Sequence, residues 1–330
     1  MNAIRKMKEN EHAVSPIVAT LVLIVVAVVG AVAVGTIMGT FSSDVSKKTS
    51  AGEAGSASSA EILIGGSTTV QPVAEAIAKE YKKVSPGVEV SVNGGGSGAG
   101  VNAVGMGTID IGASSDLSKI TTARTTHPEW DLRETMIGGS AVVFIVSDDV
   151  TVNGSVSDTE LKAFYENGTP IANITATTAY HRAESSGTEE TAANWVRGKN
   201  SFDDIPSRDN LKTVSGNSGM LAAIQTDTVG LGFIDMGFAF PATGGVASGI
   251  KVLNITGYQP TTKDNIKDAA KGVVQGYTST KYPKGLARGL YLITAGEPSI
   301  LEKDFISFAA GPQSIDAVHA AGVFHVLDLM

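Results

Sequence analysis

The fold can be predicted outward from one segment, Glu61-Ile62-Leu63-Ile64-Gly65-Gly66-Ser67-Thr68-Thr69. Its first four residues are typical of a short strand, which the two glycines close. Apolar side chains then recur at helical spacing from Val70 to Tyr81, and a second strand follows at Val88–Val92. A further helix is expected to run through Val104, before a third strand at Ile109–Ala113. Strands that alternate with helices predict an α/β fold with a parallel sheet and right-handed crossovers.

Three short turns rich in glycine, serine and threonine recur where a strand is expected to lead into a helix: Gly66–Thr69, Gly96–Gly98 and Ser186–Thr188. The first turn of a helix carries backbone N–H groups without an intrahelical partner, and the positive end of the helix dipole. Hydroxyl groups add further hydrogen-bond donors. Because ligands of open α/β sheets sit at the carboxyl ends of the strands, we expect the three turns to converge on one anion. This pattern indicates binding rather than catalysis.

The third turn belongs to a denser motif, Arg182-Ala183-Glu184-Ser185-Ser186-Gly187-Thr188. It places a cation, an acid and several hydroxyl groups at the entry to a helix. The planar guanidinium of Arg182 offers paired N–H groups suited to a tetrahedral oxyanion. We expect the next two residues, Glu189 and Glu190, to form a solvated face, since carboxylates that pointed towards an anion would repel it.

The glycine run Gly94–Gly100 has several interpretations on its own. Gly98-x-Gly100-x-x-Ala103 fits the dinucleotide fingerprint in form, but the acid that should end the next strand is displaced into a turn, at Asp116. A Walker loop would need Gly-Lys-Ser/Thr, and a nucleophile elbow would need a glycine where Ala99 stands. By itself the run is typical of a flexible loop with Ser97 as a helix cap. Because two other turns of the same kind occur in the chain, an anion site is the favoured interpretation of the run.

The composition limits the classes of partner and chemistry. With 330 residues, 42% of them hydrophobic, the chain is long enough for two domains. A net charge of −8 argues against a nucleic-acid partner, and the absence of cysteine excludes disulfides, cysteine-based metal sites and a thiol nucleophile. Four histidines show no metal-ligand spacing: His127, His181, His319 and His325. We therefore expect no catalytic residue, no metal and no cofactor, and a protein that is not an enzyme.

The N-terminal segment is expected to act as a membrane anchor. A basic leader at residues 1–13 precedes an apolar run from Ile17 to Met38 that contains no charged residue. At about 1.5 Å per residue this run spans the ~30 Å hydrocarbon core of a bilayer, so residues 14–41 are predicted to form a transmembrane helix rather than a buried core helix. Basic residues before the helix predict a single-pass protein of the cell membrane with a cytoplasmic N-terminus and an extracytoplasmic domain. Residues 42–60 are typical of a flexible linker.

The segment Glu11–Thr20 and the apolar run after it resemble the N-terminal region of archaeal type IV pilin-like proteins. In that family a prepilin-type peptidase trims a short basic leader just before the hydrophobic helix. The resemblance implies processing near Ala13–Val14, with the helix retained. A pilin-like structural subunit of the cell surface is therefore an alternative to a dispersed, anchored binding protein.

From about Ile62 to Val326 the chain resembles the solute-binding proteins of phosphate ABC importers. The resemblance is carried by motifs that occur in order along the chain: Gly66–Pro72, Asn93–Gly100, Asp110–Ser115, Arg182–Thr188, Gly216–Gly219 and Gly230–Phe233. It implies a two-lobed type II periplasmic-binding-protein fold in which each lobe is a mostly parallel sheet flanked by helices. Lobe I would comprise residues 61–141 and 247–330, and lobe II residues 142–246. Phosphate would lie in the cleft between them.

The resemblance also implies which residues contact phosphate. Eight positions match donors of the family: Thr68, Thr69, Ser97, Ser115, Arg182, Ser186, Gly187 and Thr188. The family also uses acceptor carboxylates. Glu184 takes the acidic position after the arginine, and Asp116 lies one place from the other expected acid, where Ser115 stands. Glu189 replaces the basic residue often found after Ser-Gly-Thr. The implied partners are inorganic phosphate and the permease subunits of an importer.

The acceptor carboxylates predict selectivity for phosphate. Hydrogen phosphate can donate a proton to Glu184 or Asp116, whereas sulfate near neutral pH has none to give and would be rejected. Binding would close the two lobes. The same fold tuned to another tetrahedral oxyanion is an alternative. A surface phosphatase is another, and it would need a metal cluster or an activated nucleophile that the sequence does not show.

Overall fold

The computed structural model describes residues 60–184, 186–242 and 244–330. The expected leader at 1–13, the expected anchor at 14–41 and the expected linker, apart from its last residue, lie outside the described residues. Within the described ranges no helix is both long enough and apolar enough to cross a membrane.

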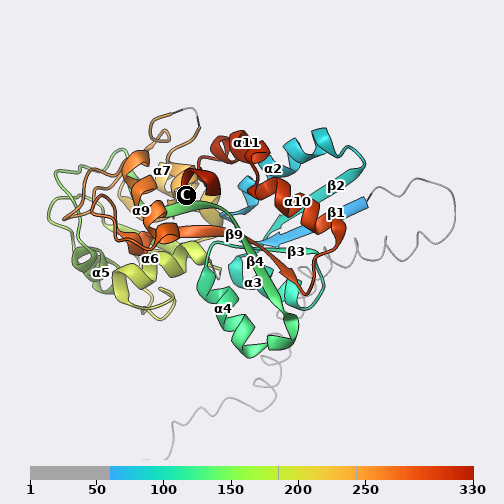
Figure 1. Cartoon of the computed structure of the whole chain (residues 1–330). Helices are drawn as coiled ribbons and strands as arrows, with labels where there is room; N and C mark the ends of the chain where they lie inside the picture. The colour runs from blue at the N-terminus through green and yellow to red at the C-terminus, as the bar shows by residue number, and fades with distance from the viewer. Residues whose placement is uncertain (1–59, 185, 243) are drawn as a thin grey trace, which may run out of the picture. The chain divides into compact units, whose positions relative to one another are not determined.

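Strands and helices alternate through the first part of the described chain, as the apolar spacing predicts (Figure 1). The first elements are β1 Ala60–Gly66, α2 Gln71–Val84, β2 Val88–Gly94, α3 Ser97–Gly105, β3 Ile111–Ser114, α4 Leu117–Thr126 and β4 Leu132–Ser147. They are followed by α5 Asp158–Asn167, β5 Thr178–Arg182, α6 Gly187–Arg197, β6 Leu211–Val214, α7 Gly216–Thr226, β7 Gly230–Asp235 and α8 Met236–Ala239. The last elements are β8 Ile250–Val252, α9 Lys263–Gln275, β9 Ala287–Ala295, α10 Ile300–Ala310, α11 Ile315–Ala320 and β10 Phe324–His325.

The strands form one mixed sheet in the order β2-β1-β3-β9-β4-β7-β5-β6, with β8 and β10 paired to β4. β1 pairs in parallel with β2 and β3, and β5 pairs in parallel with β6 and β7. The pairs made by β4 and β9 are antiparallel. The fold is therefore a mixed α/β fold, whereas a mostly parallel sheet was expected in each lobe. The difference arises because two antiparallel strands join the parallel groups.

Strand β4 connects the two halves of the sheet. Its residues Leu132–Ala141 pair with β9, and Val142–Val146 pair with β7. The second half of the strand continues the unbroken apolar run that begins at Ala141, and every side chain of that run is completely buried. Such a run, with no alternation, is typical of a strand covered on both faces.

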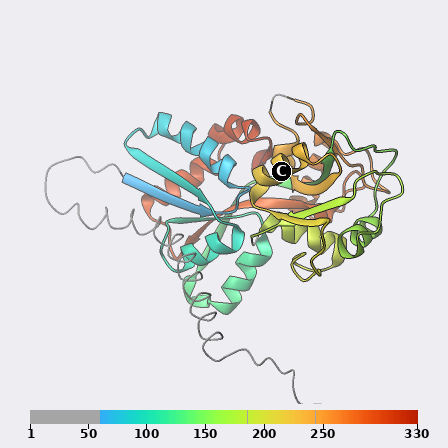
Figure 2. The same cartoon turned by 180° about the vertical axis from the view of Figure 1, so that it is seen from behind.

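Two hydrophobic cores lie on the two halves of the sheet, and we call the parts around them lobe I and lobe II. In lobe I the strands β1 and β3 pack against α2, α10 and α11 through side chains such as Ile64, Ile77 and Phe305. In lobe II the buried half of β4 packs with α5, α6, α7 and α9. Figure 1 shows α2, α10 and α11 on one side of the lobe I strands, and α3 and α4 on the other. Figure 2 shows from behind that the blue and cyan elements of lobe I and the yellow elements of lobe II flank the strands that connect them.

The lobe II core extends further along the sequence than expected. β8 pairs with Ile145–Ser147 of β4, and Ile250 and Ile266 are buried in the lobe II core. The core changes within β9, where Ala287 belongs to lobe II and Leu290 to lobe I. This corrects the assignment of the whole of 247–330 to lobe I. Apolar spacing shows that a segment is buried, but not which edge of a sheet it joins.

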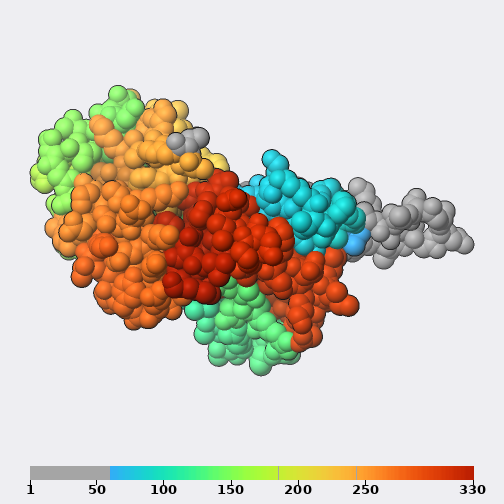
Figure 3. All heavy atoms as spheres, turned by 45° about the horizontal axis from the view of Figure 1, so that its top comes forward, coloured from blue at the N-terminus to red at the C-terminus, as the bar shows by residue number. Residues whose placement is uncertain are grey.

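The end of the chain covers part of lobe I. α11 buries Val318 in the lobe I core beside α2, and β10 pairs with Gly138 and Gly139 of β4. In the space-filling view this dark red segment lies beside the cyan surface of α2 (Figure 3). The C-terminal residues therefore help to fix the half of β4 that leads into the second lobe.

Side-chain caps set where several helices begin. Ser157 and Glu160, three residues apart, form a capping box at the start of α5. At the start of α6 the Ser186 hydroxyl accepts a hydrogen bond from the Thr188 backbone N–H at 3.2 Å. At the start of α4 the Asp116 carboxylate accepts a hydrogen bond from the Ser118 backbone N–H at 2.8 Å. The last two caps place polar side chains just beyond the ends of β5 and β3.

Candidate functional site

The three turns rich in glycine, serine and threonine meet between the lobes. Ser67 Oγ donates to Ser115 Oγ at 3.0 Å, and the hydroxyl oxygens of Ser97 and Ser115 lie 3.4 Å apart. Thr69 Oγ1 lies 3.0 Å from Thr188 Oγ1, which joins the first turn, in lobe I, to the third, in lobe II. All five residues are almost completely buried. The turns thus converge, as their positions after the strands predict.

Gly187, the first residue of α6, is in tight contact with lobe I. A Cβ atom built on it would lie 2.6 Å from Ser115 Oγ, 2.9 Å from Ser97 Oγ and 3.3 Å from the Cβ atom of Asp116. Only a residue without a side chain fits at this distance, so glycine lets the start of α6 lie directly against the lobe I hydroxyls.

Arg182 ends β5 and is completely buried. Its Nε donates to Glu184 Oε1 at 2.9 Å, and its Nη2 also contacts that oxygen. Nη2 donates further to Thr68 Oγ1 at 3.1 Å, and Nη1 donates to Asn217 Oδ1 at 3.2 Å. Burial lowers the pKa of the Arg182 guanidinium, although the Glu184 carboxylate beside it favours the charged form. Through Thr68, this buried cation also joins the two lobes.

Two carboxylates at the site each keep a free oxygen. Glu184 Oε1 also accepts the backbone N–H of Gly216 at 3.1 Å, while its Oε2 is buried and has no hydrogen-bond partner. Asp116 Oδ1 accepts the backbone N–H of Ser118, and its Oδ2 is likewise buried without a partner. A buried acceptor without a donor is unfavourable. Both oxygens are therefore suited to a ligand that carries its own proton.

Glu189 and Glu190 are buried, which corrects the expectation of a solvated face. Glu189 accepts the backbone N–H of Arg182 at 2.7 Å and a second backbone N–H, from the loop after α6, at 2.9 Å. Glu190 reaches lobe I, where Lys119 Nζ lies 2.8 Å from its Oε2. Burial, and after it the nearby Asp116 carboxylate, raises the pKa of Glu190 against the opposite effect of Lys119. Local sequence patterns carry no sign of this burial, because the compensating groups come from other elements.

Sequence reasoning missed three buried residues that complete the cluster: Asn217, Asp235 and Arg288. Nη2 of Arg288 lies 3.0 Å from both Thr69 Oγ1 and Thr188 Oγ1, and 2.7 Å from Asp235 Oδ2. Asn217 Oδ1, which accepts from the first arginine, also accepts the backbone N–H of Asp235 at 3.0 Å. The sequence carries one sign of this role for Arg288, because it is the charged residue in the otherwise apolar segment that forms β9.

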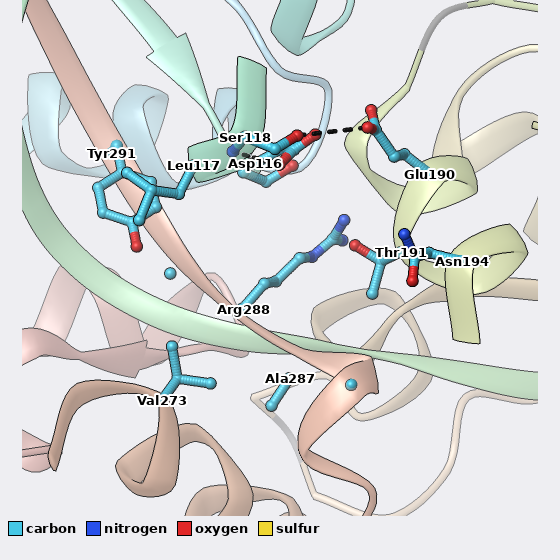
Figure 4. A pocket seen from close by; sticks show the side chains of 13 residues that line it. Asp116, Leu117, Ser118, Glu190, Thr191, Asn194, Val273, Ala287, Arg288 and Tyr291 are labelled. Carbon is cyan, nitrogen blue, oxygen red and sulfur yellow. Dashed lines mark hydrogen bonds between the residues drawn. The ribbon is translucent and has the colours of Figure 1, made fainter. Parts of the chain in front are cut away.

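A pocket of about 270 Å³ lies beside this cluster (Figure 4). Its walls come from the start of α4, from α6 and from β9. Figure 4 shows Arg288 extending from β9 into the space between Asp116 and Ser118 on one side and Glu190 and Thr191 on the other. The pocket therefore lies between the lobes, beyond the carboxyl ends of β3 and β5, where ligands of α/β sheets bind.

One group within the described ranges has the spacing of a metal site, although no such spacing is visible in the sequence: His181, Glu189 and Asp203. His181 Nδ1 lies 3.6 Å from Glu189 Oε1 and 3.8 Å from Asp203 Oδ1. The Glu189 oxygen already accepts two hydrogen bonds, from Ser201 and Phe202. The lone pairs of this oxygen are thus in use, which makes the group a poor fit for a metal centre.

The residues predicted for the site all lie in or next to this one cluster: Thr68, Thr69, Ser97, Ser115, Asp116, Arg182, Glu184, Ser186, Gly187 and Thr188. They supply hydroxyl, amide and guanidinium donors from both lobes, together with a few acceptors. Such an arrangement can surround a small anion and exclude water from it.

Comparison with known proteins agrees on the fold class. Residues 51–313 match the family described as the PBP superfamily domain. Two curated relatives carry the name phosphate-binding protein PstS. The one from Borreliella burgdorferi is 23% identical over 260 residues, which cover 74% of this chain and 89% of the relative. The one from Bacillus subtilis is 25% identical over 259 residues, which cover 76% and 75%.

Solved structures are similar over most of the chain. A phosphate ABC transporter substrate-binding protein with bound phosphate from Clostridium perfringens has a TM-score of 0.62 at 19% identity, and covers 81% of this chain and 99% of its own. An ABC-type phosphate transport receptor from Vibrio cholerae has a TM-score of 0.55 at 21% identity, with 80% and 99% covered. At these identities the structural likeness concerns the fold.

Proposed function

The chain belongs to the PBP superfamily, and we propose that it binds inorganic phosphate between its lobes and delivers it to the permease subunits of an ABC importer. The observation that carries this proposal is the buried set of donors that both lobes contribute around Arg182, Thr69 and Thr188. The curated relatives support it, since both are named phosphate-binding proteins. The role is binding, with no reaction on the ligand.

Selectivity would come from the two unpartnered carboxylate oxygens, Glu184 Oε2 and Asp116 Oδ2. Hydrogen phosphate can donate its proton to either oxygen, whereas sulfate would oppose one acceptor to another. A buried charged group that loses its partner costs about 3–5 kcal/mol. A cost of that size is enough to make phosphate the preferred anion by more than about a hundredfold.

Calorimetric titration of the purified full-length chain with phosphate, arsenate, sulfate and molybdate tests the proposal. We expect phosphate to bind most tightly. The variants Glu184→Gln and Asp116→Asn should narrow the ratio of phosphate to sulfate affinity, while Glu297→Gln, which changes an exposed carboxylate paired with Arg133, should leave it unchanged. An unchanged ratio in both site variants would refute the role of the carboxylates. Tighter binding of another anion would instead support the same fold tuned to a different oxyanion.

Further assays address the alternative functions and the membrane anchor. Incubation with a chromogenic phosphate ester should release no product, and turnover would contradict a pure binding role. For the anchor, residues 14–41 should keep the protein in the membrane fraction after alkaline carbonate extraction, with the domain open to external protease. Electron microscopy of surface filaments that contain this chain would favour the pilin-like structural role.

A further inference from the structure

Arg288 is buried in β9, yet much of its guanidinium has no partner. Nη2 donates to the hydroxyls of Thr69 and Thr188 and to the carboxylate of Asp235. Nε and Nη1 are buried and have no hydrogen-bond partner in the described part of the chain. Nη2 therefore has its hydrogen-bond partners, whereas Nε and Nη1 are available to donate to a ligand.

Such an arrangement is unfavourable within the protein alone. N–H groups of a charged side chain that are removed from water without an acceptor cost more free energy than neutral ones. Arg288 also acts on Arg182, because repulsion between the two guanidinium groups adds to burial in lowering the pKa of Arg182. Two buried cations that repel each other indicate that an anion belongs within reach of both.

Asp235 fixes the direction in which Arg288 points. Its Oδ2 accepts from Nη2 of Arg288 and from Ser140 Oγ at 2.6 Å, and its Oδ1 accepts the backbone N–H of Gly237 at 3.0 Å. The acid is thus held by its own partners and holds the guanidinium at Nη2. The side chain of Arg288 lines the 270 Å³ pocket between α4 and α6.

The same pocket is lined by an acceptor that also lacks a partner, Asp116 Oδ2. Unpaired donors on Arg288 and an unpaired acceptor on Asp116 are complementary to one class of ligand, a tetrahedral oxyanion that keeps one proton. Its deprotonated oxygens would accept from the guanidinium, and its protonated oxygen would donate to the carboxylate.

We infer that Arg288 is a second guanidinium ligand of the bound anion, beside Arg182, and that its Nε and Nη1 donate to oxygens of hydrogen phosphate in this pocket. The inference rests on the proposed phosphate-binding function. It gives the site one arginine from β5 in lobe II and one from β9, the strand in which the chain returns to lobe I. The two negative charges of hydrogen phosphate would then offset the repulsion between the guanidinium groups of Arg182 and Arg288.

The test measures phosphate affinity and stability together in variants of the full-length chain. Arg288→Lys keeps a positive charge near Asp235 but cannot offer the fork of N–H groups. We expect its Kd for phosphate to rise at least about tenfold, with little change in the melting temperature measured without phosphate. Since Arg288→Met would leave a buried acid unpaired, it is combined with Asp235→Asn. That pair should weaken binding by about 30-fold or more. Arg208→Lys, in lobe II but outside the pocket, is the matched control and should keep the wild-type Kd.

The outcomes separate this inference from the proposed function. If the wild-type chain binds phosphate and both Arg288 variants bind it with the wild-type Kd, the inference is overturned and the proposed function stands. The inference is also overturned if Arg208→Lys weakens binding as much as Arg288→Lys does, because the effect would then be one of folding. A wild-type chain that binds none of the four anions overturns both.

Discussion

Replacing Gly187 by alanine should weaken phosphate binding by keeping the lobes apart. The added methyl group would lie 2.6 Å from Ser115 Oγ and 2.9 Å from Ser97 Oγ, separations that real Cβ atoms essentially never show. Turning the hydroxyls aside would break the contacts among Ser67, Ser97 and Ser115. Asp116 Cβ, at 3.3 Å, restricts the remaining space. The contact is therefore relieved most readily when α6 moves away from lobe I.

The size of the effect follows from packing. Inserting a methyl group into a close-packed contact costs about 1–3 kcal/mol. Because this cost falls on the closed form, the Kd for phosphate should rise by about 5-fold to about 150-fold. The free energy of unfolding without phosphate, measured by urea denaturation, should fall by less than the binding free energy that calorimetry records.

A glycine on the lobe II helix α7 provides the matched control. A Cβ atom on Gly219 would meet nothing within 4 Å, so Gly219→Ala should leave the Kd unchanged and stabilise the helix by up to about 1 kcal/mol. If Gly187→Ala binds phosphate as tightly as the wild-type chain does, the reasoning that closure presses α6 against the lobe I hydroxyls is refuted.

Three other predictions concern single side chains. Arg182→Ala should weaken phosphate binding by about 2–5 kcal/mol in calorimetry, because the anion loses a completely buried guanidinium donor; a smaller loss would contradict a direct role. The pKa of Glu190 is raised in the folded protein, so its contribution to stability is present below about pH 4 and is lost as the pH rises through the raised pKa. In urea denaturation, Glu190→Gln should therefore gain stability relative to the wild-type chain as the pH rises above about 4, and a constant difference would argue against this. Ser157→Ala should lower the free energy of unfolding by about 1 kcal/mol through loss of the α5 cap, with no change in Kd.

The elements that sequence analysis located correctly are those whose cause is local. Helical spacing after Thr69 predicted α2, and the start of α5 likewise depends on two residues of one turn, Ser157 and Glu160. The unbroken apolar run from Ala141 is typical of a buried strand, but it does not show that β4 begins as early as Leu132. There the exposed and half-buried side chains of the first residues hide the strand.

The residues of the candidate site also divide into those with a local cause and those that depend on distant groups. Local sequence patterns were enough to show which loops carry donors, since hydroxyls and glycines after a strand have a local reason to gather at helix starts. The dense motif from Arg182 to Thr188 marked the third of these loops. The folded chain was needed to show that Arg288 and Asp235 complete the cluster, that Glu189 is buried, and that β8 joins lobe II. In each of these cases the compensating partner comes from another element of the chain. The sequence shows that a buried charged residue needs a compensating partner and that an apolar residue needs a core to pack in. Which distant group provides that partner or core depends on the fold.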